Sequence, residues 1–132
     1  FNSEEYYGAS GELEYLGYIS DEQIAFMINI DSPCHIGSQT AASFYNFSDD
    51  MQAVCDKVIE SSLGIVKGNV WYAGDHAPFL FRGIPCMAVT AADFCEGALK
   101  HTHTPKDTLE TVDCGLVEVS ARFVADAVAA LF

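Results

Sequence analysis

Carboxylates and imidazoles, the side chains that bind divalent metal ions, stand at three separate places in this 132-residue sequence. Glu4 and Glu5 are adjacent in the opening stretch FNSEEYYG, where no basic residue is close. Asp31 ends the apolar run IAFMINI, and the later stretch HTHTPKDT carries His101 and His103. The spacing is long and irregular, unlike the compact H-E-x-x-H helix. By spacing alone, each residue is as readily explained as a structural or solvated one.

The sequence predicts that these residues lie where strands end. Residues 24–30 form an almost continuous apolar run, which is typical of a central strand buried on both faces. Residues 67–72 and 84–90 are predicted as two further strands, with a short helix between them within 75–81. In sheets of this kind, functional residues gather beyond the carboxyl ends of the strands.

Three helices are predicted to alternate with these strands. Ser10 is expected to cap the first, with Leu13 and Leu16 on one face. Ser48 is expected to cap the second, over residues 49–63, and Asp113 the last, which runs to the C-terminus. The alternation predicts an α/β layered domain with a mixed, partly parallel sheet and helices on both faces.

Composition narrows the class of protein. A formal net charge of −13 argues against nucleic acid and anionic membrane surfaces as partners. No signal peptide or apolar run long enough to span a bilayer is apparent, although a first residue of Phe suggests that residue 1 is not the start of translation. The five cysteines, odd in number and without metal-like spacing, favour small buried residues and mildly favour the cytoplasm, with secretion left open.

Four motifs in order give the sequence a more specific character. FNSEEYYG, MINID, GDHAPF followed by RGIPCMAV, and HTPKDTLETVD extend from residue 1 to residue 113. In this order and spacing they resemble the back half of the catalytic domain of M28 zinc-dependent peptidases, which include many aminopeptidases. The resemblance implies that residues 1–132 are the C-terminal portion of such a domain, with a zinc-peptidase-like sheet incomplete at its N-terminal side.

The resemblance also implies roles for individual residues. Glu4 would be the general acid/base and Glu5 a metal ligand. Asp31 would bind the other ion, and His103 would join Glu5 because Thr-Pro-x-Asp-Thr follows it. The implied reaction is hydrolysis at peptide N-termini by a water molecule activated between two zinc ions.

Four further residues would shape the substrate pocket rather than hold metal. Asp75, His76 and Phe79 match the family's Asp-His-x-x-Phe motif, and Asp107 would orient the His103 loop. His35, in Cys34-His35-Ile36, is expected to be an ordinary loop residue.

The sequence departs from the family pattern in one respect that matters. The family places a His-x-Asp motif and a metal-bridging Asp before the Glu-Glu pair, and nothing precedes Phe1 here. We therefore expect partial or absent zinc binding by this segment alone. Its expected partners are a peptide substrate and either the missing N-terminal segment or a second copy.

Two other functions remain open at this point. Glutaminyl cyclases are related to the family, but they typically have Trp before the final histidine, where Thr102 stands here. A non-catalytic binding domain of the same fold is the other alternative, and a purely structural α/β domain would not explain the four motifs together.

Overall fold

The computed structural model describes residues 8–132, so Glu4 and Glu5 lie outside the described residues. The elements in chain order are α2 (Ser10–Tyr18), η1 (Asp21–Gln23), β1 (Met27–Ile30), β2 (Thr40–Tyr45), α3 (Asp49–Ser61), β3 (Ile65–Lys67), α4 (Ala77–Leu80), β4 (Cys86–Ala91), η2 (Ala98–Lys100), η3 (Leu109–Thr111) and α5 (Cys114–Leu131). Strands and helices alternate along most of the chain, as predicted.

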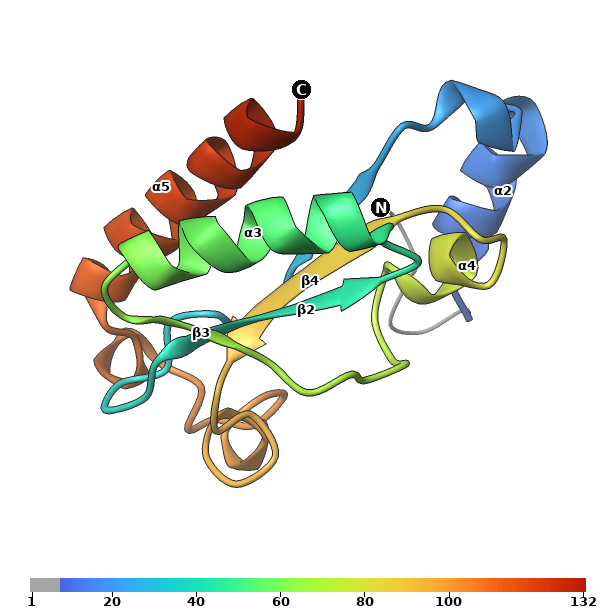
Figure 1. Cartoon of the computed structure of the whole chain (residues 1–132). Helices are drawn as coiled ribbons and strands as arrows, with labels where there is room; N and C mark the ends of the chain where they lie inside the picture. The colour runs from blue at the N-terminus through green and yellow to red at the C-terminus, as the bar shows by residue number, and fades with distance from the viewer. Residues whose placement is uncertain (1–7) are drawn as a thin grey trace.

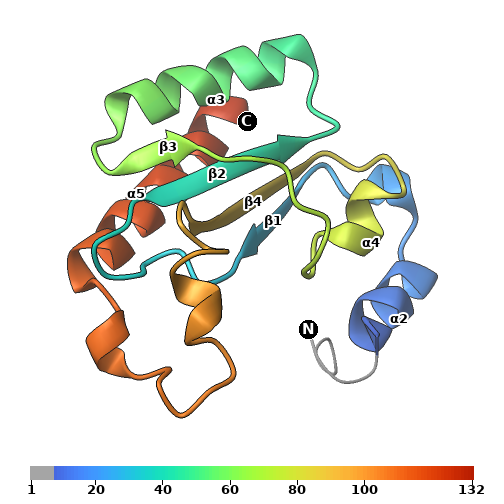
Figure 2. The same ribbon diagram turned by 90° about the horizontal axis from the view of Figure 1, so that it is seen from below.

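The described strands form one mixed sheet in the order β1-β4-β2-β3, of which Figure 1 labels β2, β3 and β4 and Figure 2 also labels β1. β1 runs parallel to β4, β2 runs antiparallel to β4, and β3 runs parallel to β2. β4 is buried at all six of its residues, as expected for an inner strand. The prediction of a central strand at 24–30 is wrong for the described sheet, because β1 lies at its edge and Ile30 is 54% exposed.

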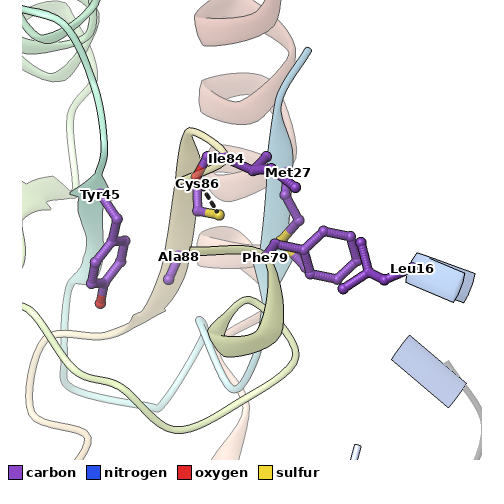
Figure 3. Close-up of a cluster of buried hydrophobic side chains, with 7 residues drawn as sticks. All are labelled: Leu16, Met27, Tyr45, Phe79, Ile84, Cys86 and Ala88. Carbon is purple, nitrogen blue, oxygen red and sulfur yellow. Dashed lines mark hydrogen bonds between the residues drawn. The ribbon is translucent and has the colours of Figure 1, made fainter. Parts of the chain in front are cut away.

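Helices cover both faces of the sheet, which confirms the predicted layering. On one face, α3 and α5 pack together over Met87 and Val89, with Phe123 of α5 fully buried (Figure 1). On the other face lie α2 and α4 (Figure 2). There Leu16 of α2 and Phe79 of α4 join a buried cluster (Figure 3), whose other members are Met27, Tyr45, Ile84, Cys86 and Ala88.

Side-chain caps fix two of the three predicted helix starts. Ser48 Oγ accepts a hydrogen bond from the Met51 N–H, and Asp113 Oδ1 accepts from the Gly115 and Leu116 N–H groups. The predicted Ser10 cap is wrong: Ala9 precedes α2 in a left-handed conformation, without a side-chain cap.

The segment 67–72 is not the strand that its apolar residues predicted, because β3 ends at Lys67. The residues after β3 are held by side chains of β2 instead of by a strand ladder. Ser43 Oγ donates to the Asn69 carbonyl at 2.6 Å, and Tyr45 Oη donates to the Trp71 carbonyl at 2.6 Å. β2 itself escaped prediction, because TAASFY has neither a clear alternation nor a long apolar run.

All five cysteines are free thiols. Cys34, Cys55 and Cys86 are buried, and burial raises the pKa of the Cys86 thiol to about 12. Cys95 and Cys114 are exposed, so the expectation of small buried residues holds for three of the five. Among residues 8–132, no helix has the length and apolar character needed to cross a membrane.

Candidate functional site

Because β1 and β4 are parallel, the two predicted metal-binding segments leave the sheet at the same end, where both strands have their carboxyl ends. Asp31 follows β1 directly, and its N–H donates to the Val89 carbonyl at 2.9 Å. The loop that leads to His103 follows β4 at the same edge, since parallel strands share the direction of their carboxyl ends. The Asp31 side chain is exposed and accepts a hydrogen bond from Ser32 Oγ.

His103 adopts an uncommon backbone conformation. Its φ is 61°, in the left-handed region, and the residue is exposed. A non-glycine residue held there stores strain, which is often found at functional positions. Thr104 Oγ1 donates to the His101 carbonyl at 2.6 Å, and the Asp107 N–H donates to the Thr104 carbonyl. These bonds fold the segment after His103 into a tight turn.

The described residues do not form a complete metal site by themselves. Within residues 8–132, no three side chains of His, Cys, Asp or Glu lie close enough together to hold an ion. Asp31 and His103 offer a carboxylate and an imidazole, which suit zinc, but two ligands are fewer than a catalytic zinc site uses. The other two predicted site residues, Glu4 and Glu5, lie outside the described residues, so the ligand set stays a prediction.

His76 is the most enclosed of the predicted pocket residues. It is fully buried, and both of its ring nitrogens are within hydrogen-bond distance of a partner. Nε2 lies 3.0 Å from the Trp71 carbonyl, which can only accept, so Nε2 carries the proton. Nδ1 then accepts from the side-chain amide of Asn29 at 3.2 Å.

The surroundings of His76 favour its neutral form. Burial lowers the pKa of the ring below its ordinary value, and this outweighs the opposing effects of the Trp71 carbonyl and of the Asp75 and Asp31 carboxylates. The rings of Trp71 and His76 also meet edge to face, with centroids 4.6 Å apart. His76 is therefore built as a fixed, uncharged hydrogen-bonding group.

Phe79 shares the enclosed character of His76. It is 2% exposed and packs in the cluster that contains Leu16 and Met27 (Figure 3). Asp75, which precedes His76, is only half-buried. The Asp-His-x-x-Phe motif thus anchors α4 in the core, and its predicted role beside a substrate stays a prediction.

A second histidine group lies at the same end of the sheet as Asp31. His35 Nδ1 is 3.0 Å from Asp93 Oδ2, and the rings of His35 and His101 stack with centroids 5.8 Å apart. Asp93 comes from the loop after β4, 58 residues away from His35. No sequence spacing signals this pair, and the expectation that His35 is an ordinary loop residue does not account for it.

A cavity of about 270 Å³ opens beside this second group. Its walls are mostly apolar and include Pro33, Val112 and Val117. His35, His101 and Asp107 supply polar groups to it. Asp107, which the sequence assigned to orienting the His103 loop, therefore shares a hollow with the two stacked imidazoles.

Comparison with known proteins places this arrangement in context. The profile of peptidase family M28 matches residues 1–128. A search of curated proteins finds no match. Among solved structures, the aminopeptidase from Aneurinibacillus sp. strain AM-1 superposes with a TM-score of 0.68 at 21% sequence identity, covering 92% of this chain and 30% of that one. The chain thus spans about a third of the length of the structure that it matches. Since the family profile covers nearly all of its residues, the chain belongs to peptidase family M28.

Proposed function

We propose that this chain contributes part of the catalytic site of a zinc-dependent aminopeptidase. The observation that carries the proposal is that Asp31 follows β1 and the loop leading to His103 follows β4, its parallel neighbour, so that both segments leave the same end of the sheet. The chain that carries them belongs to a peptidase family. The fold likeness to a solved aminopeptidase adds support.

Glu5, Asp31 and His103 would hold zinc together with ligands beyond this segment. When bound, zinc lowers the pKa of a water molecule toward about 7 and polarises the substrate carbonyl. Glu4 would take a proton from the attacking water and later give it to the leaving amine. The two glutamates would divide these tasks, with Glu5 binding metal and Glu4 moving the proton.

The test uses the longest natural form of the protein with leucine p-nitroanilide as the substrate and N-acetyl-leucine p-nitroanilide as its blocked control. We expect hydrolysis of the first, which needs a free amino group, and not of the second. Glu4→Gln should abolish turnover while zinc content is kept, whereas His103→Ala should lower zinc content as well. Hydrolysis that is unaffected by Glu4→Gln, or no hydrolysis by a zinc-loaded protein, would overturn the proposal.

The same preparation separates the competing functions. A glutaminyl cyclase would convert an N-terminal glutamine peptide to its pyroglutamyl form and release ammonia. A non-catalytic binding domain would turn over neither substrate. Either result would replace the aminopeptidase assignment.

A further inference from the structure

Three segments contact one another around His35: the loop after β1, the loop after β4 and the segment before α5. They lie at the end of the sheet where β1 and β4 have their carboxyl ends. We propose that His35, together with Asp93 and His101, acts as a positioning clamp that fixes the loop after β1 relative to the loop after β4. The clamp would set the separation of Asp31 and His103, so the inference rests on the proposed function. Neither the family match nor the sequence motifs assign a role to His35 or Asp93.

The backbone around His35 is held first. The Ile36 N–H donates to the Thr111 carbonyl at 2.9 Å, and the Asp113 N–H donates to the Cys34 carbonyl at 2.8 Å. These bonds flank an isolated bridge between His35 and Val112. The loop that starts at Asp31 is thereby attached to the segment that precedes α5.

The His35 side chain then reaches the loop after β4. Its Nδ1 lies 3.0 Å from Asp93 Oδ2, and the Asp93 N–H donates to Ser38 Oγ at 3.3 Å. Burial raises the pKa of the Asp93 carboxyl, but hydrogen bonds from Ser38 and His35 outweigh it, so the pKa lies below its ordinary value. The carboxylate therefore remains an acceptor for His35 at neutral pH.

Gly97 shows how closely this contact is built. A Cβ at this position would overlap the Asp93 carboxylate and lie 2.9 Å from His35 Cε1. The Gly97 N–H also donates to the Asp93 carbonyl at 2.6 Å. Only a residue without a side chain lets the loop close on the His35–Asp93 pair.

The ring of His101 stacks on His35, and this contact would hold the chain two residues before His103 in place. The two rings lie 29° from parallel, and His101 Nδ1 is buried with no hydrogen-bond partner in the described part of the chain. Thr102 donates to the Ala98 carbonyl through both its N–H and its Oγ1, each at 3.0 Å. His103 therefore extends from a turn that is fixed on one side by His35.

The clamp makes two separable contacts, and substitutions can remove them one at a time. His35→Phe keeps a ring to stack on His101 but loses the bond to Asp93. His35→Asn keeps a hydrogen-bond donor but loses the ring. Asp93→Asn keeps an acceptor for His35, whereas Asp93→Ala removes it. Asp56→Asn serves as the matched control, since it weakens a carboxylate contact with Lys67 that joins α3 to β3.

The variants are compared in the longest natural form of the protein. Three quantities are measured: zinc affinity by competition with a chromophoric chelator, kcat and KM, and the visible spectrum of the Co²⁺-substituted enzyme. We expect His35→Phe and Asp93→Ala to weaken zinc binding by roughly 10–100-fold, as removal of groups that orient metal ligands does elsewhere. Asp93→Asn should recover most of this loss, kcat should fall more than KM rises, and the Co²⁺ spectrum should shift.

Amide hydrogen exchange over residues 92–107 supplies a readout that does not depend on activity. The clamp predicts faster exchange in this segment for His35→Phe and Asp93→Ala and unchanged exchange for Asp56→Asn. A wild-type protein without zinc affinity or turnover overturns the proposed function. Exchange, affinity and spectrum that match the wild type in both variants overturn the clamp.

Discussion

Two histidine environments adjoin this sheet, and they are built in opposite ways. His76 is fully buried, with one ring nitrogen bonded to Asn29 and the other to the Trp71 carbonyl. His35 is only partly buried, uses one nitrogen on Asp93 and lines an open cavity with His101. The first ring is surrounded by core, and the second is surrounded by loops.

The difference separates a structural histidine from one that can affect chemistry. A neutral imidazole whose two nitrogens are both hydrogen-bonded within the protein has no lone pair or proton left for a substrate or a metal ion. A ring that links its own loop to a neighbouring loop can affect the relative positions of the two loops without disturbing the packing of the core. By their burial, His76 and Phe79 of the Asp-His-x-x-Phe motif resemble the first kind, while the motif's role beside a substrate stays a prediction. In the proposed clamp, His35 would be of the second kind.

Removal of the His76 ring should have the largest effect on stability. We expect His76→Ala to lower the free energy of unfolding by about 3 kcal/mol, because it leaves a cavity and removes the partners of Asn29 and the Trp71 carbonyl. Urea unfolding followed by circular dichroism measures the change. A loss below about 1 kcal/mol would show that the His76 environment is as tolerant as that of His35 and would remove the contrast.

A side chain at Gly97 should strain the second environment instead. Gly97→Ala is expected to cost about 1–3 kcal/mol, since the new Cβ would overlap Asp93 and press on His35. Gly17→Ala is the control, because it lies in α2 with no atom within 4 Å of the added Cβ and should be neutral or stabilising. Equal unfolding free energies for Gly97→Ala and the wild type would contradict the close approach.

Acidification should destabilise the protein through His76. The native pKa of this ring lies below its ordinary 6.5, so just below pH 6.5 the unfolded state binds more protons than the native state. The His76 contribution is complete above about pH 6.5 and falls as the pH drops toward the native pKa. The facing carboxylates of Asp75 and Asp31 limit the fall but do not reverse it.

Unfolding free energies at pH 7.5 and 5.5 give the measurement. His76→Asn should flatten the dependence between these pH values, whereas the wild type should lose stability. The lowered pKa of Asp93 acts in a separate window, since its contribution is lost only below about its ordinary 3.8. A slope that survives in His76→Asn would assign the dependence to another group.

Deletion of the His35 side chain should cost far less stability than deletion of His76. We expect His35→Ala to lower the free energy of unfolding by about 1 kcal/mol, because its hydrogen bond to Asp93 is partly open to water. Thermal unfolding of His35→Ala beside His76→Ala tests the ranking directly. A loss that equals that of His76→Ala would mean that His35 is a core residue.

The smallest effect is expected at an exposed ion pair between α3 and β3. Lys67 Nζ lies 3.0 Å from Asp56 Oδ1, with side chains 55% and 40% exposed. Asp56→Asn should therefore change the free energy of unfolding by at most about 0.5 kcal/mol, and less in high salt. Unfolding in 50 mM and 500 mM NaCl checks both statements.

The sequence predicted best those elements whose signals are local. Asp113 caps α5 as expected, and β4 begins two residues after the predicted start at 84 and ends one residue after the predicted end at 90. β2 was missed because TAASFY has no clear alternation or long apolar run. β3 was displaced because side-chain hydrogen bonds from Ser43 and Tyr45 hold the residues that were predicted to continue it.

The candidate site follows the same division. Asp31 could be placed at a strand end from the run that precedes it, and the structure puts it there. The approach of His35 to Asp93 depends on loops that the sheet order alone brings together, so no sequence pattern announces it. Their pairing depends on tertiary structure, which local sequence patterns do not report.

The position of β4 has a consequence for how the chain acquires its structure during synthesis. Within the described sheet β1 pairs only with β4, and the β2–β3 pair joins the opposite side of β4 (Figure 2). Within the described residues, a chain that ends before Cys86 therefore holds β1 apart from the β2–β3 pair, and such short pieces are marginal in water. The described sheet can be completed only after β4, which ends at Ala91, has been synthesised.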